Sequence, residues 1–255
     1  MLIFDKNFQF LSKINNYLQN PFNLKKRMQQ PIWRRLLSYI MDVPIETVES
    51  GYNPYLNVIM KRGQYQLLTE NAIYSYGELY DNFSKAFKRI DLDSIKIENV
   101  LILGFGLGSI PLMLETLFHK KYQYTAVEID PEVLKLANKY TVCNLTSTIK
   151  FHLSDAATYA SFSEDTFDMI CMDVFLDDIV PTELEQEGFL LDLKKMLNPN
   201  GILLFNKLAH YKKDKNSAEL FFQNHFKRVF TEGTYLDVEG NYILLNRSDI
   251  LKKRV

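Results

Sequence analysis

The clearest chemical signal in the sequence is a run of alternating glycines directly after a short apolar segment. Residues 100–103 are all apolar, and the loop that follows reads Gly104, Phe105, Gly106, Leu107, Gly108. Glycines allow a tight turn and let a ligand lie against the backbone, and a helix that starts there offers free N–H groups. The pattern favours a nucleotide-binding loop that includes Gly104, Phe105, Gly106 and Gly108, with a chance glycine turn as the alternative.

An acidic residue near the end of the next apolar segment strengthens this interpretation. Glu128 lies 24 residues after Gly104, close to the spacing of about 20 residues at which an acid meets ribose hydroxyls in dinucleotide-binding folds. We therefore predict that Glu128, with the adjacent Ile129, binds a ribose.

Two other acids have competing local explanations. Asp155, followed by Ala156, could accept a hydrogen bond from the exocyclic amine of adenine, or it could cap a helix. Asp130 precedes Pro131, a residue suited to the first helical position, so we interpret Asp130 as a structural cap.

Asp173 stands at the end of the fourth apolar segment, residues 167–174. In an open α/β sheet, ligands bind outside the carboxyl ends of strands where the strand order reverses. We expect Asp173 to face the reacting end of a bound cofactor, as a general base or as a partner of a cationic substrate. The alternative is a solvated aspartate at a strand end.

The elements that would position these residues alternate along the chain. Strand-like and helical segments alternate over residues 99–226, which predicts parallel strands joined by right-handed crossovers. Strand-like patterns at 228–231 and 242–246 predict an antiparallel last strand. The expected fold is therefore α/β, with a mostly parallel sheet.

The chain ahead of this domain has different patterns. Residues 55–76 contain short strand-like segments and predict a small antiparallel β unit, whereas residues 1–50 have helical apolar spacing that we expect to pack in the core. The predicted division is 1–54, an N-terminal helical segment; 55–90, the small β unit and a connecting helix; and 91–255, the cofactor-binding domain.

The charge composition bears on which kinds of molecule the protein binds. Thirty basic and thirty-one acidic side chains nearly cancel, which gives no electrostatic reason to expect nucleic acid or an anionic membrane. A small-molecule ligand is the expectation, and the absence of a run of about 20 apolar residues predicts a cytoplasmic protein. The four histidines are scattered without ligand spacing, so we predict no metal site.

With these motifs, the sequence resembles the spermidine synthase family, the polyamine aminopropyltransferases, within the class I S-adenosylmethionine-dependent methyltransferase superfamily. The resemblance covers residues 55–208 and includes the small β unit. It implies a Rossmann-like fold, a transferase activity, and S-adenosylmethionine or its decarboxylated form as cofactor. It also implies that Asp173 is the catalytic base and that Tyr74, Glu78 and Tyr80 lie beside the acceptor.

The sequence departs from the family pattern at three positions. Leu107 stands where family members carry an acid in the glycine loop, Leu176 where a second aspartate follows the first, and Ile73 where a glutamine is usual. Burying a cationic amine without paired carboxylates is costly, so these changes argue against unmodified putrescine binding.

Three hypotheses for function therefore remain open. The first is aminopropyl transfer from decarboxylated S-adenosylmethionine, and the second is methyl transfer from intact S-adenosylmethionine on the same scaffold. In both, the acceptor is a small molecule with an amine or hydroxyl. The third is a non-catalytic nucleotide-binding or interaction protein. A homodimer is expected by analogy with the family alone.

Overall fold

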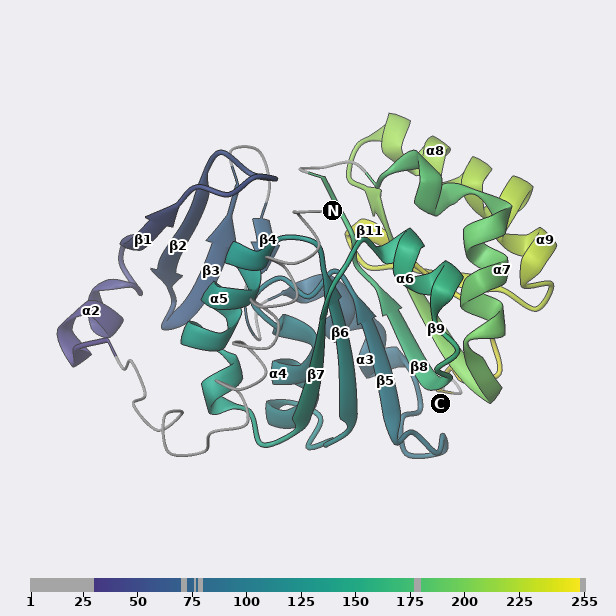
Figure 1. Ribbon diagram of the computed structural model, residues 1–255, viewed down its shortest axis with the longest axis horizontal. Helices are drawn as coiled ribbons and strands as arrows, with labels where there is room; N and C mark the ends of the chain where they lie inside the picture. The colour runs from purple at the N-terminus through teal and green to yellow at the C-terminus, as the bar shows by residue number, and fades with distance from the viewer. Residues whose placement is uncertain (1–29, 70–72, 76, 78–79, 177–179, 253–255) are drawn as a thin grey trace, which may run out of the picture.

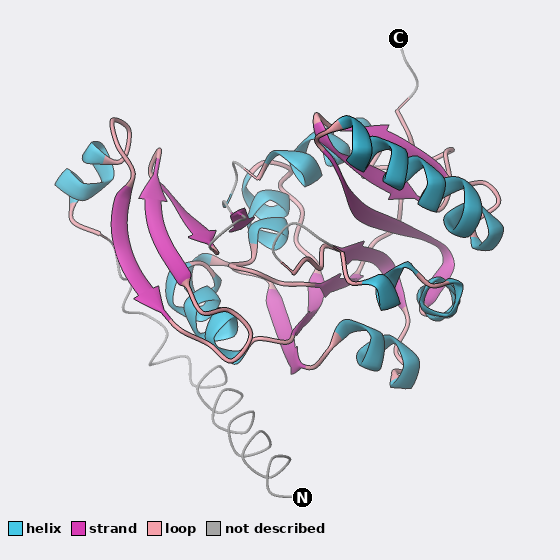
Figure 2. Ribbon diagram, turned by 90° about the horizontal axis from the view of Figure 1, so that it is seen from above, coloured by secondary structure: helices cyan, strands magenta, loops and turns pink. Residues whose placement is uncertain are grey.

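Two β-sheets form the framework of the protein (Figures 1 and 2). The computed structural model describes residues 30–69, 73–75, 77, 80–176 and 180–252. The smaller sheet is antiparallel, with its four strands in chain order: β1 (Val43–Val48), β2 (Leu56–Lys61), β3 (Gln64–Leu68) and β4 (Ile73–Ser75).

The larger sheet has seven strands in the order β10-β11-β9-β8-β5-β6-β7. Strands β5 to β9 run parallel, whereas β11 is antiparallel to both of its neighbours. The prediction of a mostly parallel sheet with an antiparallel last strand is confirmed. The strands are β5 (Asn99–Leu103), β6 (Gln123–Glu128), β7 (Thr148–Leu153), β8 (Phe167–Met172), β9 (Leu197–Ala209), β10 (Thr234–Asp237) and β11 (Gly240–Leu245).

Helices cover both faces of this sheet, because its central strands bury side chains on both sides. Val100 and Ile102 of β5 face one core, and Leu101 and Leu103 face the other. The first core includes α3 (Asp81–Arg89), α4 (Ser109–Thr116), α5 (Pro131–Tyr140) and the small sheet. The second includes α6 (Ala156–Phe162), η3 (Thr182–Glu185), α7 (Glu187–Lys195), α8 (Lys212–Phe221), the π-helical turn η4 (Phe222–Phe226) and α9 (Lys227–Val229).

Helices α2 (Ile32–Leu37) and η2 (Val142–Asn144) complete the set for the described residues. None of the helices in these residues is long and apolar enough to cross a bilayer.

The structure corrects three predictions about local structure. Strand β1 lies inside the stretch expected to be helical, where four of its six residues are β-branched and favour a strand. The apolar side chains of α2 and the turn after it do not pack in the core, since Ile32 and Ile40 are 78% and 86% exposed. Residues 228–231 do not form a strand, because Phe222, Phe226 and Phe230 recur at helical spacing and pack together in the second core.

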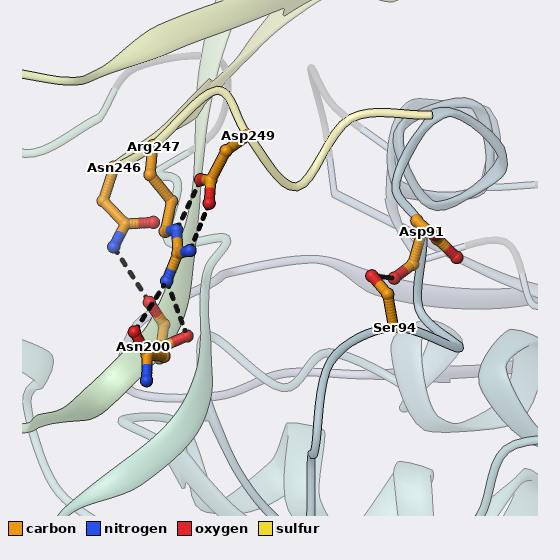
Figure 3. A network of polar contacts seen from close by, with 7 residues as sticks. Asp91, Ser94, Asn200, Asn246, Arg247 and Asp249 are labelled. Atoms are coloured by element: carbon orange, nitrogen blue, oxygen red, sulfur yellow. Dashed lines mark hydrogen bonds and ion pairs between the residues drawn. The ribbon is translucent and has the colours of Figure 1, made fainter. Parts of the chain in front are cut away.

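Side chains after β11 hold this strand in register on β9. Asn246 accepts a hydrogen bond from the Leu203 N–H at 2.9 Å and donates to the Gly201 carbonyl oxygen at 3.0 Å. Arg247 binds the Asp249 carboxylate with two nitrogens and donates to the Asn200 carbonyl oxygen (Figure 3). These contacts fix one end of the β9–β11 pair, so the polar residues at its other end meet in a defined register.

Gly104, at the end of β5, lets the chain pass close to the backbone of Asp173 at the end of β8. Its φ of 80° is left-handed, and a Cβ at this position would overlap the carbonyl oxygen of Asp173 and lie 2.8 Å from the carbonyl carbon. The Asp173 N–H donates to the Leu103 carbonyl oxygen at 2.8 Å. Only glycine therefore lets the loop turn directly beside the backbone of Asp173.

Gly104→Ala should lower the free energy of unfolding by about 2–4 kcal/mol, because the methyl group meets backbone and the left-handed φ becomes strained. Urea unfolding followed by circular dichroism measures this change. Gly188→Ala in α7 is the matched control, since nothing lies within 4 Å of a Cβ there, and it should be neutral or stabilise the protein by up to about 1 kcal/mol. Equal stability of Gly104→Ala and the wild type would contradict the close contact.

Candidate active site

The carboxyl ends of β5, β6 and β8 open onto one cavity of about 800 Å³. It lies where the strand order reverses, with β6 and β7 on one side of β5 and β8 and β9 on the other. The predicted site residues that line this cavity are Tyr80, Gly104, Gly106, Glu128, Ile129, Asp155, Ala156 and Asp173.

Two predicted residues shape the glycine loop and do not line the cavity. The Phe105 side chain is 4% exposed and packs edge-on against Phe151, with 5.1 Å between the ring centres. Gly108 precedes α4 with a φ of 82°, and a Cβ there would lie 2.8 Å from the Phe105 ring. Phe105 therefore anchors the loop in the core, and only its backbone N–H faces the site residues.

Two predicted acceptor-side residues are not placed. Tyr74 belongs to β4, but its side chain is outside the described part of the structure, as is the whole of Glu78. Their assignment beside the acceptor stays a prediction.

Glu128 braces the glycine loop. One carboxylate oxygen accepts hydrogen bonds from the N–H groups of Phe105 and Gly106, and the other accepts from those of Ile129 and Asp130. Burial raises the pKa of Glu128, and these backbone N–H groups oppose the rise. Binding of ribose by Glu128 stays a prediction, and it would require the hydroxyls to share or replace these bonds.

Asp130 and Asp155 both cap helices. Asp130 accepts from the Glu132 N–H at 2.9 Å, as predicted, and its second oxygen accepts from Ser50 and Asn53 at 2.5 and 3.2 Å. It therefore ties the segment between β1 and β2 to α5. Asp155 accepts from the Thr158 N–H at 2.8 Å while lining the cavity, so the cap is present and binding of adenine stays a prediction.

Asp173 is a buried carboxylate whose acidity is altered by its surroundings. Its Oδ1 accepts hydrogen bonds from the Tyr80 hydroxyl at 3.2 Å and from Asn206 Nδ2 at 2.8 Å. Burial raises the pKa of Asp173 to about 7, against the opposing effect of these two hydrogen bonds. A carboxylate that titrates near neutral pH suits a general base.

Two residues behind Asp173 were not predicted from the sequence. Asn206 is fully buried in β9, and Asn241 Nδ2 donates to its Oδ1 at 2.9 Å. A polar residue directly after the apolar run 202–205 was a usable signal for Asn206. The part played by Asn241 depends on the β9–β11 register, which local sequence does not reveal.

Leucines stand at two positions where the family pattern has acids. Leu107 is buried in the first core, and Leu176 lines the cavity with 52% of its surface exposed. Lys85 also lines the cavity and pairs with Asp81 at 3.2 Å and Glu239 at 2.8 Å, which neutralises part of the remaining acidic charge. Within the described residues, no group of three or more His, Cys, Asp or Glu could hold a metal ion.

The fold is of the Rossmann-like methyltransferase type, and comparisons with known proteins agree. The family model described as "Methyltransferase domain" matches residues 101–205. A probable spermidine synthase from Corynebacterium glutamicum superposes with a TM-score of 0.63 at 20% identity, over 81% of each chain. A spermidine synthase from Thermotoga maritima gives 0.61 at 16% identity, over 80% of this chain and 72% of that one.

Proteins with similar sequences include an aminopropyltransferase and a methyltransferase. A polyamine aminopropyltransferase from Vibrio vulnificus is 32% identical over 158 residues, which cover 59% of this chain and 50% of the relative. A human eEF1A lysine and N-terminal methyltransferase is 29% identical over 119 residues, 42% of this chain and 17% of the relative. The chain is similar to members of the spermidine synthase family and, over its central part, to a methyltransferase domain, and it spans only half of the first relative's length.

The raised pKa of Asp173 predicts a pH-dependent change in stability. The group binds its proton more tightly in the folded state than in the unfolded state, where the pKa is 3.8. Its contribution to stability is therefore full below pH 4 and is lost as the pH rises to about 7. Asp173→Asn should be more stable than the wild type at pH 8, by up to about 4 kcal/mol, and the difference should shrink at pH 5. Urea unfolding at both pH values measures this, and an equal effect at both would contradict the raised pKa.

Proposed function

We propose that this protein transfers an alkyl group from an S-adenosylmethionine-type sulfonium donor to a small acceptor, with Asp173 as general base. The observation that carries the proposal is the buried Asp173 carboxylate, which titrates near neutral pH and shares one cavity with Gly104, Gly106 and Glu128. An amine acceptor fits best, and a hydroxyl is the alternative.

The charge of the cavity fits such a donor. Seven carboxylates and one lysine line it among the described residues, and this excess of negative charge favours a cationic ligand. Its volume of about 800 Å³ lies within the usual range of small-molecule sites, about 300–1,000 Å³. The turn at Gly104 also lets a ligand approach the backbone closely.

The residues of the chain then have separate tasks. When bound, the donor supplies an alkyl carbon on sulfur: the acceptor nitrogen bonds to this carbon, the carbon–sulfur bond breaks, and its electron pair stays on sulfur. Asp173 takes the proton that the acceptor releases, and Tyr80 and Asn206 hold the carboxylate in place. Positioning supplies much of the acceleration, because a sulfonium is already a good leaving group.

Aminopropyl transfer is the reaction that we favour, on the similarity to a polyamine aminopropyltransferase and the acidic cavity. Methyl transfer is the second candidate, and the position of Leu107 favours it. Because Leu107 is buried in the core, the glycine loop presents no acid at this position to repel the carboxylate of intact S-adenosylmethionine.

Asp173→Asn should lower kcat by about 10²–10⁴-fold while donor binding is retained, because only the proton acceptor is lost. Turnover of a panel of amines with each donor, together with calorimetry of donor binding, measures both quantities. Asp168→Asn is the matched control: this aspartate lies on the same strand, bonds Asn198 and does not line the cavity. Unchanged turnover in Asp173→Asn would contradict the proposed base.

The relative affinities for decarboxylated and intact S-adenosylmethionine distinguish aminopropyl transfer from methyl transfer. We expect decarboxylated S-adenosylmethionine to bind about tenfold more tightly than the intact form, because the acidic cavity repels an added carboxylate. Isothermal titration calorimetry with both compounds tests this directly. Tighter binding of the intact donor would favour methyl transfer in its place.

A further inference from the structure

Asn206 occupies an unusual position for an amide side chain. It lies within β9 with no exposed surface, among apolar neighbours that fill the two cores. A buried amide is costly unless its polar atoms have partners, and both ends of this one are bonded. Its partners, Asp173 and Asn241, both line the cavity.

The orientation of the Asn206 amide is set by Asn241. In the antiparallel pair, Asn206 is opposite Ile243 and Asn241 is opposite Leu208, so the two asparagines are diagonal neighbours. Asn241 Nδ2 donates to Asn206 Oδ1 at 2.9 Å. The oxygen end of Asn206 is thereby occupied, and its NH₂ group is turned toward Asp173.

The two hydrogen bonds to Asp173 end on the same oxygen. Asn206 Nδ2, from β9, and the Tyr80 hydroxyl, from the start of α3, both donate to Oδ1. Both bonds favour the ionised carboxylate, and together they fix the side chain. The other carboxylate oxygen, Oδ2, is then the one that can accept a proton from the acceptor.

We propose that Asn206, oriented by Asn241, is a positioning residue that favours the ionised form of Asp173 and directs its Oδ2 to the reacting group. This inference rests on the proposed function, in which Asp173 is the base. Asn241 acts one step further away, because its side chain donates to Asn206 rather than to Asp173.

Other groups around Asp173 also influence its protonation. Tyr80 donates to it directly, and the buried thiol of Cys171 lies two residues earlier on β8. The other titratable groups that line the same cavity among the described residues are Tyr52, Asp81, Lys85, Glu128, Asp130, Asp155, Glu183, His210 and Glu239. None of these groups is changed when an asparagine is replaced. The asparagine variants therefore report the effect of the Asn206 and Asn241 hydrogen bonds on the protonation of Asp173.

The test is a carboxyl-carbon NMR titration of the full chain, with aspartate labelled and the Asp173 signal assigned by its absence in Asp173→Asn. Asn206→Ala should raise the titration midpoint of Asp173 by about one pH unit, because a hydrogen bond to the charged form is lost. Asn241→Ala should raise it by less, since it only frees the Asn206 amide to turn. The acid limb of the kcat profile should move in the same direction.

Asn198→Ala is the matched control. Asn198 Nδ2 donates to Asp168 Oδ1 at 2.7 Å between the same two strands, far along β8 from Asp173. This variant should move the titration of Asp168 and leave that of Asp173 unchanged. It therefore reports any general effect of removing an asparagine from β9.

An unchanged Asp173 midpoint in Asn206→Ala would overturn the inference. If this variant does not fold, Asn241→Ala decides the matter, and an unchanged midpoint there has the same meaning. The proposed function fails by a different result, namely no turnover by the wild type with either donor, and the titration is read independently of turnover.

Discussion

The site depends on a close contact between two neighbouring strand ends. At Gly104 the chain leaves β5 with a left-handed φ and passes against the backbone carbonyl of Asp173, which has just left β8. No side chain fits between them. This contact places the start of the glycine loop and the Asp173 carboxylate at one edge of the sheet, and it explains why both line one cavity.

Two halves of the cavity meet at this contact, the glycine loop and the surroundings of Asp173, and different interactions hold each of them. The loop half is held mainly through backbone groups. Glu128 accepts hydrogen bonds from four backbone N–H groups, and the Phe105 ring packs in the core. The half around Asp173 is fixed by side chains, from Tyr80 at the start of α3 to Asn206 and Asn241 on β9 and β11. Departures from the family pattern fall in both halves, at Leu107 in the glycine loop and at Leu176 after Asp173.

The sequence predicted what local patterns determine. The apolar segment at 100–103, the glycine loop and the cap at Asp130 depend on residues close together in the chain, and the structure contains each of them. The parallel alternation also led correctly to the reversal of strand order near Asp173. Outcomes set by distant packing could not be predicted in the same way. Phe105 turned into the core because Phe151 receives its ring, and the pairing of Asn206 with Asn241 follows from a register fixed at the other end of β11.

The central claim is that one cavity brings a nucleoside on the glycine loop together with Asp173 as base. A crystal structure of the protein with methylthioadenosine, the nucleoside product of aminopropyl transfer, tests it most directly. The account predicts that the nucleoside lies against Gly104 and Gly106, with its thioether sulfur facing Asp173 and the Tyr80 and Asn206 bonds intact. A nucleoside bound elsewhere, or one whose sulfur faces away from Asp173, would contradict it.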